Sequence, residues 1–405
     1  MKQLENSKIE YKSFFLKISF VFLLLPHLKT DYLNNNPLWD TIFNIGRIIS
    51  FILILGYCIF VRKRISKIVI WIVIIKLTML FITVIEGGEV YYCIVDTFST
   101  ISVAMICDVG CESKELFYSS ALFCFEIFIY INLLTEVIYS PDGMYVSQYG
   151  RFVARFNYFL GFYNNHTKYF IPALLVAFLY MYYTGKRLRT YCLTLAIYVS
   201  AILVWSGGVL LSLTVMIILY VFSKNRRKLF NFFQYWMMHI WFFIFIILFK
   251  IQYLFQWLID GILGKWDSLI GRMILWNAQM KLIAESLWIG HGIQSALYRG
   301  YECGIYWGGH AHNMLLEILY QGGLLYLILF IILIVVAGNG LYRCHDEKKM
   351  RIIETAFGGW CVHCLVEPFW TPFLMSMFVI AYREGAFLPK ANVQTPKIRL
   401  KFGVK

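Results

Sequence analysis

Two histidines and an asparagine lie close together at residues 310–313, where a polar segment meets a long apolar one. A neutral imidazole accepts a proton from a hydroxyl near pH 7, so His312 is a candidate general base. Asn313 could orient His312 or a substrate, and His310 is a further candidate for substrate binding. The alternative is that His312 and Asn313 only cap the helix that follows them.

Two other side chains near this pair bear on its chemistry. Glu317 is about 1.4 turns into the expected helix, where it could orient His312 or only pair with a lysine. His291 and Cys303 share a loop with the histidine pair, which raises the question of a metal site. Their spacing matches no standard zinc pattern, so we expect neither a metal nor another cofactor.

Four arginines are candidate ligands for an anionic substrate, because a guanidinium meets phosphate oxygens with two parallel hydrogen bonds. They are Arg272, Arg151, Arg155 and Arg47. Each could instead contact lipid headgroups. Trp276 shares one face of a predicted amphipathic helix with Arg272, and its ring could hold a sugar or belong to an interfacial aromatic belt.

The segments that carry these residues are embedded in an unusually apolar chain. Of 405 residues, 60% are hydrophobic and only 15% are charged, against about 25% charged in soluble domains. About twelve stretches are apolar enough to be membrane spans. They lie at 12–28, 38–61, 66–85, 90–108, 116–138, 167–184, 190–205, 208–223, 229–255, 312–337, 352–366 and 373–388. The sequence therefore predicts an all-α polytopic membrane protein.

The net charge of +14 follows the expected topology. Most basic residues fall in the short connections on one side, and the positive-inside rule then places both termini in the cytoplasm. No nucleic-acid partner is needed to explain the charge, and the expected partner is the lipid bilayer. The two long loops, 139–166 and 256–311, face outward and should carry function.

These loops divide the chain into an N-terminal helical part at 1–255, a large outer loop at 256–311 and a C-terminal part at 312–405. No nucleotide-binding fingerprint occurs in the sequence. An enzyme that faces outward must then use a substrate with its own activation, such as a lipid-linked diphosphate.

Five charged residues fall inside the predicted spans, where charges are expensive and are usually paired or functional. They are Arg47, Lys76, Asp96, Glu126 and Lys250. Arg47 could line the floor of an outer cavity. Lys76 with Asp96 or Glu126 could be a structural pair or a proton path, which keeps a transporter open as an alternative.

Two segments resemble the family of O-antigen ligases and O-antigen or capsular polysaccharide polymerases. The first combines Gly271-Arg272-x3-Trp276, Gly290-x-Gly292 and His312-Asn313-x3-Glu317-x4-Gly322-Gly323. The second runs from Arg155 through Gly161 to Asn164-Asn165-His166. One feature departs from the family, which commonly has Ser-Arg before the large loop. Here Ser206 is followed by Gly207-Gly208, so a second diphosphate ligand must come from Arg151, Arg155 or Arg47.

The resemblance implies a GT-C-like membrane glycosyltransferase at the outer face of the bacterial plasma (inner) membrane. Such enzymes use undecaprenyl-diphosphate-linked oligosaccharide as donor and as acceptor, without a metal. His312 would be the base, Arg272 would hold the donor diphosphate, and Asn165 would belong to the substrate site. The expected activity is an inverting repeat-unit polymerase in capsule or lipopolysaccharide (O-antigen) synthesis, with a chain-length regulator and a flippase as candidate partners. The alternatives are a ligase of the same family and, from another class, a lipid-linked oligosaccharide flippase.

Overall fold

The computed structural model describes residues 2–149, 152–223, 230–255, 266–305, 308–368 and 370–385. Five helical segments within these ranges are long and apolar enough to cross a membrane. They are α3 with the π-helical turn that continues it (Pro37–Arg62), α4 (Lys67–Ile85), α5 (Val90–Gly110), α6 (Lys114–Tyr139) and α14 (Met314–Leu341). This helical, apolar architecture is compatible with a membrane protein, whereas the number of spans and the GT-C fold stay predictions.

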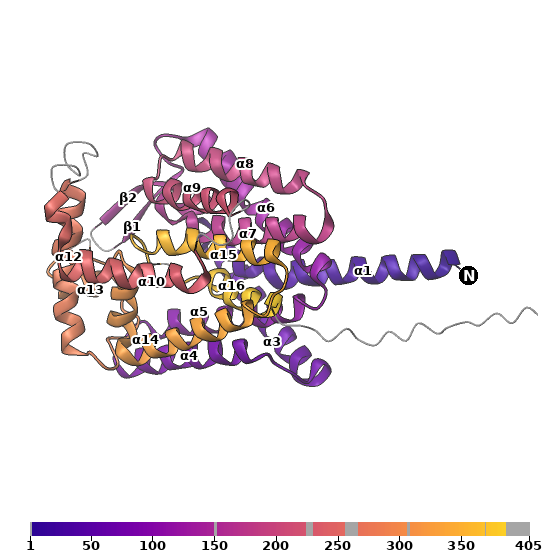
Figure 1. Ribbon diagram of the computed structural model, residues 1–405, viewed down its shortest axis with the longest axis horizontal. Helices are drawn as coiled ribbons and strands as arrows, with labels where there is room; N and C mark the ends of the chain where they lie inside the picture. Colours follow the sequence, from indigo (N-terminus) through magenta and orange to yellow (C-terminus); the bar gives the residue numbers. More distant parts are fainter. Residues whose placement is uncertain are drawn as a thin grey trace, which may run out of the picture.

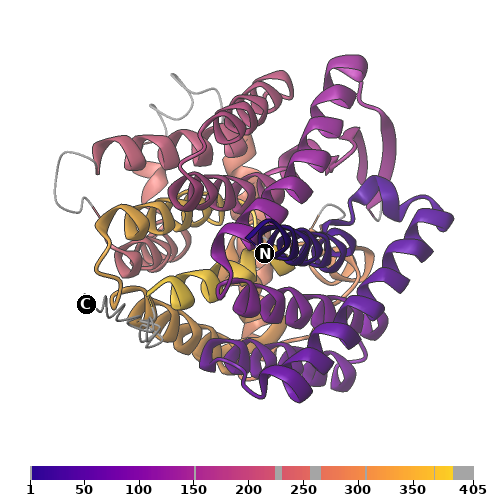
Figure 2. The ribbon, with the colours of Figure 1, turned by 90° about the vertical axis from the view of Figure 1, so that its right-hand side faces the viewer.

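The other helices complete the bundle (Figure 1). They are α1 (Lys2–Leu24), α2 (Asp31–Asn34), α7 (Thr167–Thr184), α8 (Leu188–Leu203), α9 (Gly207–Phe222), α10 (Phe232–Phe242), α12 (Trp266–Glu285), α13 (Ala296–Glu302), α15 (Glu347–His363) and α16 (Pro372–Gly385). Figure 2 shows the bundle from the end at which α1 begins.

A small antiparallel sheet forms where the sequence suggested only a loop. Its strands are β1 (Tyr145–Tyr149), β2 (Phe152–Tyr158) and β3 (Gly161–Phe162), in the order β1-β2-β3. Figure 1 places β1 and β2 at the same end of the molecule as α12 and α13. We call this the sheet end.

The expected span at 229–255 is not one continuous helix in its described part. Helix α10 continues as a π-helix that ends at Leu248, and Lys250, two residues later, has a left-handed φ of 53°. A short 3₁₀ helix, Ile251–Phe255, follows. The segment is broken because a left-handed residue cannot continue the i→i−4 hydrogen bonds of a helix.

Helix α14 is interrupted at Gly323, which has φ 59° and ψ −159°. The break exposes backbone groups that the segment 287–292 satisfies. Leu324 N–H donates to Leu287 O over 2.8 Å, and His291 N–H donates to Tyr320 O over 2.8 Å. The kink therefore joins the polar loop to α14 just beyond the histidine pair.

Several charged side chains inside the bundle are paired. Lys76 pairs with Asp96, and Glu126 pairs with Arg189. At the other end of α5, Arg62 pairs with Asp108. Pairing lowers the cost of placing these charges among apolar helices.

Candidate active site

His312 lies in a turn directly before α14 and contacts a carboxylate 55 residues further along the chain. Its Nδ1 is 2.9 Å from Oε1 of Glu367. With the Nδ1 proton donated to the carboxylate, the lone pair of Nε2 is left to accept a proton. The His312 side chain is 22% exposed, so a ligand can reach the ring. The geometry is that of a base oriented by a carboxylate.

Glu367 is held in the ionised state this arrangement requires. Burial opposes its charge, but the neighbouring His312, His310 and His363 together lower the pKa of Glu367 to about 2. The carboxylate lies in the turn between α15 and α16, and its side chain is 8% exposed. It is thus an anion among histidines at neutral pH.

Asn313 caps α14 and does not contact His312 through its side chain in the described contacts. Its Oδ1 accepts hydrogen bonds from the N–H groups of Leu315 (3.0 Å) and Leu316 (3.2 Å), while Nδ2 donates to Leu365 O (3.3 Å). These contacts of Asn313 are those of a helix cap, as the alternative interpretation of the sequence expected. Because Leu365 precedes Glu367 by two residues, the same side chain also ties the start of α14 to the turn that carries the carboxylate.

Glu317 does not orient His312 in this structure, and its partner is not a lysine. Arg299 Nη1 donates to Oε1 of Glu317 over 2.5 Å and Nη2 donates to Gln279 Oε1 over 2.8 Å. Glu317 Oε2 also accepts from Ala311 N–H over 2.8 Å. This buried network joins α12, α13 and α14 and fixes the loop that presents His312. The sequence did not single out Arg299 because its partners are up to 20 residues away.

Trp276 is buried, which argues against its use as a sugar platform. Its ring is 3% exposed, and Nε1 donates to Ala311 O over 3.0 Å. Through this hydrogen bond, Trp276 fixes the backbone of Ala311, the residue between His310 and His312. Arg272, one turn earlier on α12, is partly exposed; among the described residues it has no ion-pair partner.

The second sequence motif reaches the same corner of the molecule. The Ser206 hydroxyl donates to Asn164 Oδ1 over 2.7 Å, and Glu367 is one of the charges that act on Tyr163. Asn165 lies beside them in a 3₁₀ turn and is half-buried. The segments around 164, 206, 312 and 367 are thus neighbours at the sheet end.

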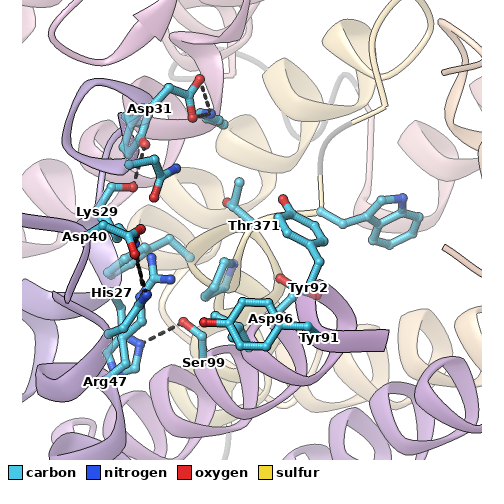
Figure 3. A pocket seen from close by; sticks show the side chains of 18 residues that line it. His27, Lys29, Asp31, Asp40, Arg47, Tyr91, Tyr92, Asp96, Ser99 and Thr371 are labelled. Atoms are coloured by element: carbon cyan, nitrogen blue, oxygen red, sulfur yellow. Dashed lines mark hydrogen bonds and ion pairs between the residues drawn. The ribbon is translucent and has the colours of Figure 1, made fainter. Parts of the chain in front are cut away.

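A polar cavity of about 430 Å³ lies next to this corner (Figure 3). The turn that carries Glu367 continues into its wall at Trp370, Thr371 and Pro372. The remaining wall is made by His27, Lys29, Asp31, Asn34, Asp40, Asn44, Arg47, Tyr91, Tyr92, Val95, Asp96, Ser99, Lys168, Tyr169 and Phe373. One short segment therefore contributes to both the His312 pair and the cavity.

Arg47 is distinguished from the other cations of this cavity. Lys29 pairs with Asp40, and Lys168 pairs with Asp31 at 3.2 Å. Arg47 donates through Nε to Pro26 O over 3.0 Å. Within the described parts of the chain, no carboxylate lies at ion-pair distance from its guanidinium. Figure 3 shows Arg47 beside Asp40 on one side of the cavity, with Tyr91 and Tyr92 on the other.

Two further predicted arginines, Arg155 and Arg272, do not line this cavity. Arg155 lies on β2 with an exposed side chain, and it is absent from the cavity lining. Arg151 falls outside the described residues.

Of the four metal ligands that the sequence suggested, His291 and Cys303 do not join the pair His310 and His312 in the described group. His291 Nε2 is 2.8 Å from Leu282 O, and Cys303 contacts Gln279. A different group converges among the described residues, because His310, His312 and Glu367 each offer a ligand atom within 4.8 Å of the others. Glu367 is also the candidate site residue that the sequence analysis did not single out. The sequence feature that could have pointed to Glu367 is its position before Pro368, in a turn between two apolar segments.

Comparison of the chain with models of known protein families gives no match. Comparison with curated proteins gives no match either.

Proposed function

We propose that this protein is a polysaccharide polymerase of the plasma membrane. It would transfer glycan from undecaprenyl diphosphate to the non-reducing-end hydroxyl of another lipid-linked repeat unit at the outer face. The single observation that carries the proposal is the contact between His312 and the ionised Glu367. The turn that carries Glu367 continues into the wall of a cavity lined by Arg47, whose guanidinium has no carboxylate partner among the described residues. The resemblance of the 271–323 segment to polymerases supplies the substrate class.

The transfer needs a base, and His312 is suited to that role. The acceptor hydroxyl loses its proton to His312 Nε2 while its oxygen bonds to the anomeric carbon of the donor. The bond from that carbon to the diphosphate oxygen breaks, and undecaprenyl diphosphate leaves. Glu367 stabilises the imidazolium that forms. A single displacement of this kind inverts the anomeric configuration.

The leaving group carries negative charge, and we assign Arg47 to neutralise it. A charge-assisted guanidinium–phosphate hydrogen bond is among the strong hydrogen bonds of proteins. Lys29 and Lys168 are already paired, so Arg47 is the cation with capacity for a new anion. Arg272 is retained as a second diphosphate ligand, since it lies on α12, whose Trp276 supports the His312 loop.

A ligase of the same family is the nearest alternative, because it uses the same donor and differs only in the acceptor. A flippase or other transporter is the alternative from another class. The Lys76–Asp96 pair favours it, because Asp96 lines the cavity and could exchange a proton there.

Purified protein incubated with lipid-linked repeat units distinguishes these functions. A polymerase gives a ladder of products, a ligase transfers glycan only to an added acceptor, and a flippase only moves lipid across the vesicle. His312→Ala should remove the ladder, since general base catalysis contributes roughly 10²- to 10⁴-fold to rate. A normal ladder from that variant would exclude His312 as the base.

A further inference from the structure

Three side chains, the proposed base among them, form a set of potential metal ligands, and the transfer reaction does not require a metal there. His312 Nδ1 is 2.9 Å from Glu367 Oε1, and His310 Nε2 is 3.8 Å from Glu367 Oε2. The rings of the two histidines are 3.9 Å apart between centroids. Two imidazoles with one carboxylate are a frequent ligand set for Zn²⁺ and related ions when a fourth position stays open.

The site has the form of a metal site in two further respects. His312 is one of four non-glycine residues with a left-handed backbone in the described ranges, and its φ of 48° turns it away from the helix. The separations of 2.9 and 3.8 Å between the histidine nitrogens and the Glu367 oxygens also suit ligands that each sit about 2.0–2.2 Å from one ion. The backbone N–H of His312 donates to His310 Nδ1 over 3.4 Å, which is long for a hydrogen bond. If His310 Nε2 binds the ion, the proton of the neutral His310 ring moves to Nδ1, and only this long contact is lost.

The surroundings keep these donors in place. The buried Arg299–Glu317 pair holds the backbone N–H of Ala311, and Trp276 binds the Ala311 carbonyl. The residue between the two histidines is therefore fixed on both sides. A ligand set that is already positioned loses little entropy when the ion binds.

We propose that His310, His312 and Glu367 bind a divalent transition-metal ion such as Zn²⁺, and that the bound ion inhibits glycan transfer. Coordination uses the Nδ1 lone pair of His312, so the proton of the neutral ring must move to Nε2. A ring with hydrogen on Nε2 has no lone pair there to accept the proton of a hydroxyl. The inhibitory part of this proposal rests on the proposed function, whereas the binding part does not.

Binding is tested by equilibrium dialysis of purified full-length protein against Zn²⁺, with the bound metal measured by atomic absorption. We expect about one tight ion per chain, with affinity lowered more than about tenfold by His310→Ala and by Glu367→Gln. His345→Ala removes an exposed histidine elsewhere and is the matched control. Unchanged binding in both variants, or an equal loss in the control, would overturn the site. Thermal unfolding without metal checks that the variants fold. If His310→Ala does not fold, His310→Asn replaces it.

Inhibition is tested by adding Zn²⁺ to the ladder assay of the wild-type protein. The ladder should shorten over the same Zn²⁺ range in which the site fills, and EDTA should restore it. A full site with an unchanged ladder would refute inhibition. If metal-free protein makes no ladder, the proposed function fails, while the dialysis result still decides whether the site exists.

Discussion

His312 adopts a backbone conformation that few histidines adopt. A left-handed non-glycine residue costs on the order of 1 kcal/mol, and such strain concentrates at functional sites. Here the conformation turns His312 toward Glu367 while Asn313 starts α14. Two contacts offset this strain: the cap that Asn313 forms on α14, and the contact between the His312 ring and Glu367.

Glu367→Gln tests whether the carboxylate orients and stabilises the base. Glutamine keeps the size of the side chain but cannot hold a positive charge on His312, so we expect the transfer rate to fall at least about tenfold. The loss should appear in kcat with little change in KM for the donor, as measured by initial rates at several donor concentrations. A change in KM alone would show that Glu367 binds substrate instead.

Arg47→Lys tests the assignment of the diphosphate to the cavity. Lysine retains the charge but loses the planar fork, so we expect KM for the donor to rise about tenfold or more. Arg187→Lys, at an exposed position between α7 and α8, is the matched control and should leave KM unchanged. Equal KM values for wild type and Arg47→Lys would place the diphosphate elsewhere.

The elements position the site through a break in one helix. Gly323 and Gly290 both have positive φ, and the backbone of Trp288 lies 2.5 Å from where a Cβ on Gly323 would be. A side chain at Gly323 would push the 287–292 segment away from α14. That segment leads to α13, which carries Arg299, so the kink contributes to the support of the His312 loop.

Gly323→Ala should therefore destabilise the protein by roughly 1–3 kcal/mol through backbone strain, and should also lower the transfer rate. Gly56→Ala is the same change at the end of α3, where the added Cβ meets nothing within 4 Å. It should therefore change the free energy of unfolding by less than about 1 kcal/mol. Unfolding in detergent, followed by circular dichroism, compares the two. Equal stabilities would mean that the kink does not need glycine.

At the scale of the whole molecule, the polar chemistry gathers at one end. The sheet, α12 and α13 share the sheet end, while α1 begins at the opposite end (Figure 1). The polar cavity adjoins the sheet, because Asp31 of its wall lies against Gly161 of β3. If the bundle spans a membrane as proposed, these two ends face different compartments. The site then meets substrate on one side only.

Cysteine labelling tests this orientation. Tyr301 is 85% exposed on α13, and Lys186 is exposed in the connection between α7 and α8. Tyr301→Cys should react with a membrane-impermeant maleimide in intact cells, whereas Lys186→Cys should react only after permeabilisation. Each is compared with the parent protein to correct for native cysteines. Reversed accessibility would invert the proposed topology.

Much of the helical architecture is encoded locally. Long apolar stretches predict α3 to α6 and α14, because burial or lipid exposure of a helix depends on the sum of its own side chains. The polar turn at 310–313 can also be recognised in the sequence, because it depends on the types of its own residues. The strands at 145–162 and the break before Lys250 were not predicted, since short strands and left-handed residues depend on their neighbours in space.

The partners of the functional residues were decided only by the tertiary structure. His312 stands out by type and place in the sequence, but its carboxylate comes from residue 367 rather than 317, because α15 and α16 return their connecting turn to the start of α14. The cavity likewise joins Arg47 to Thr371 across most of the chain. Hydropathy is a property of each segment, whereas an ion pair depends on which segments pack together.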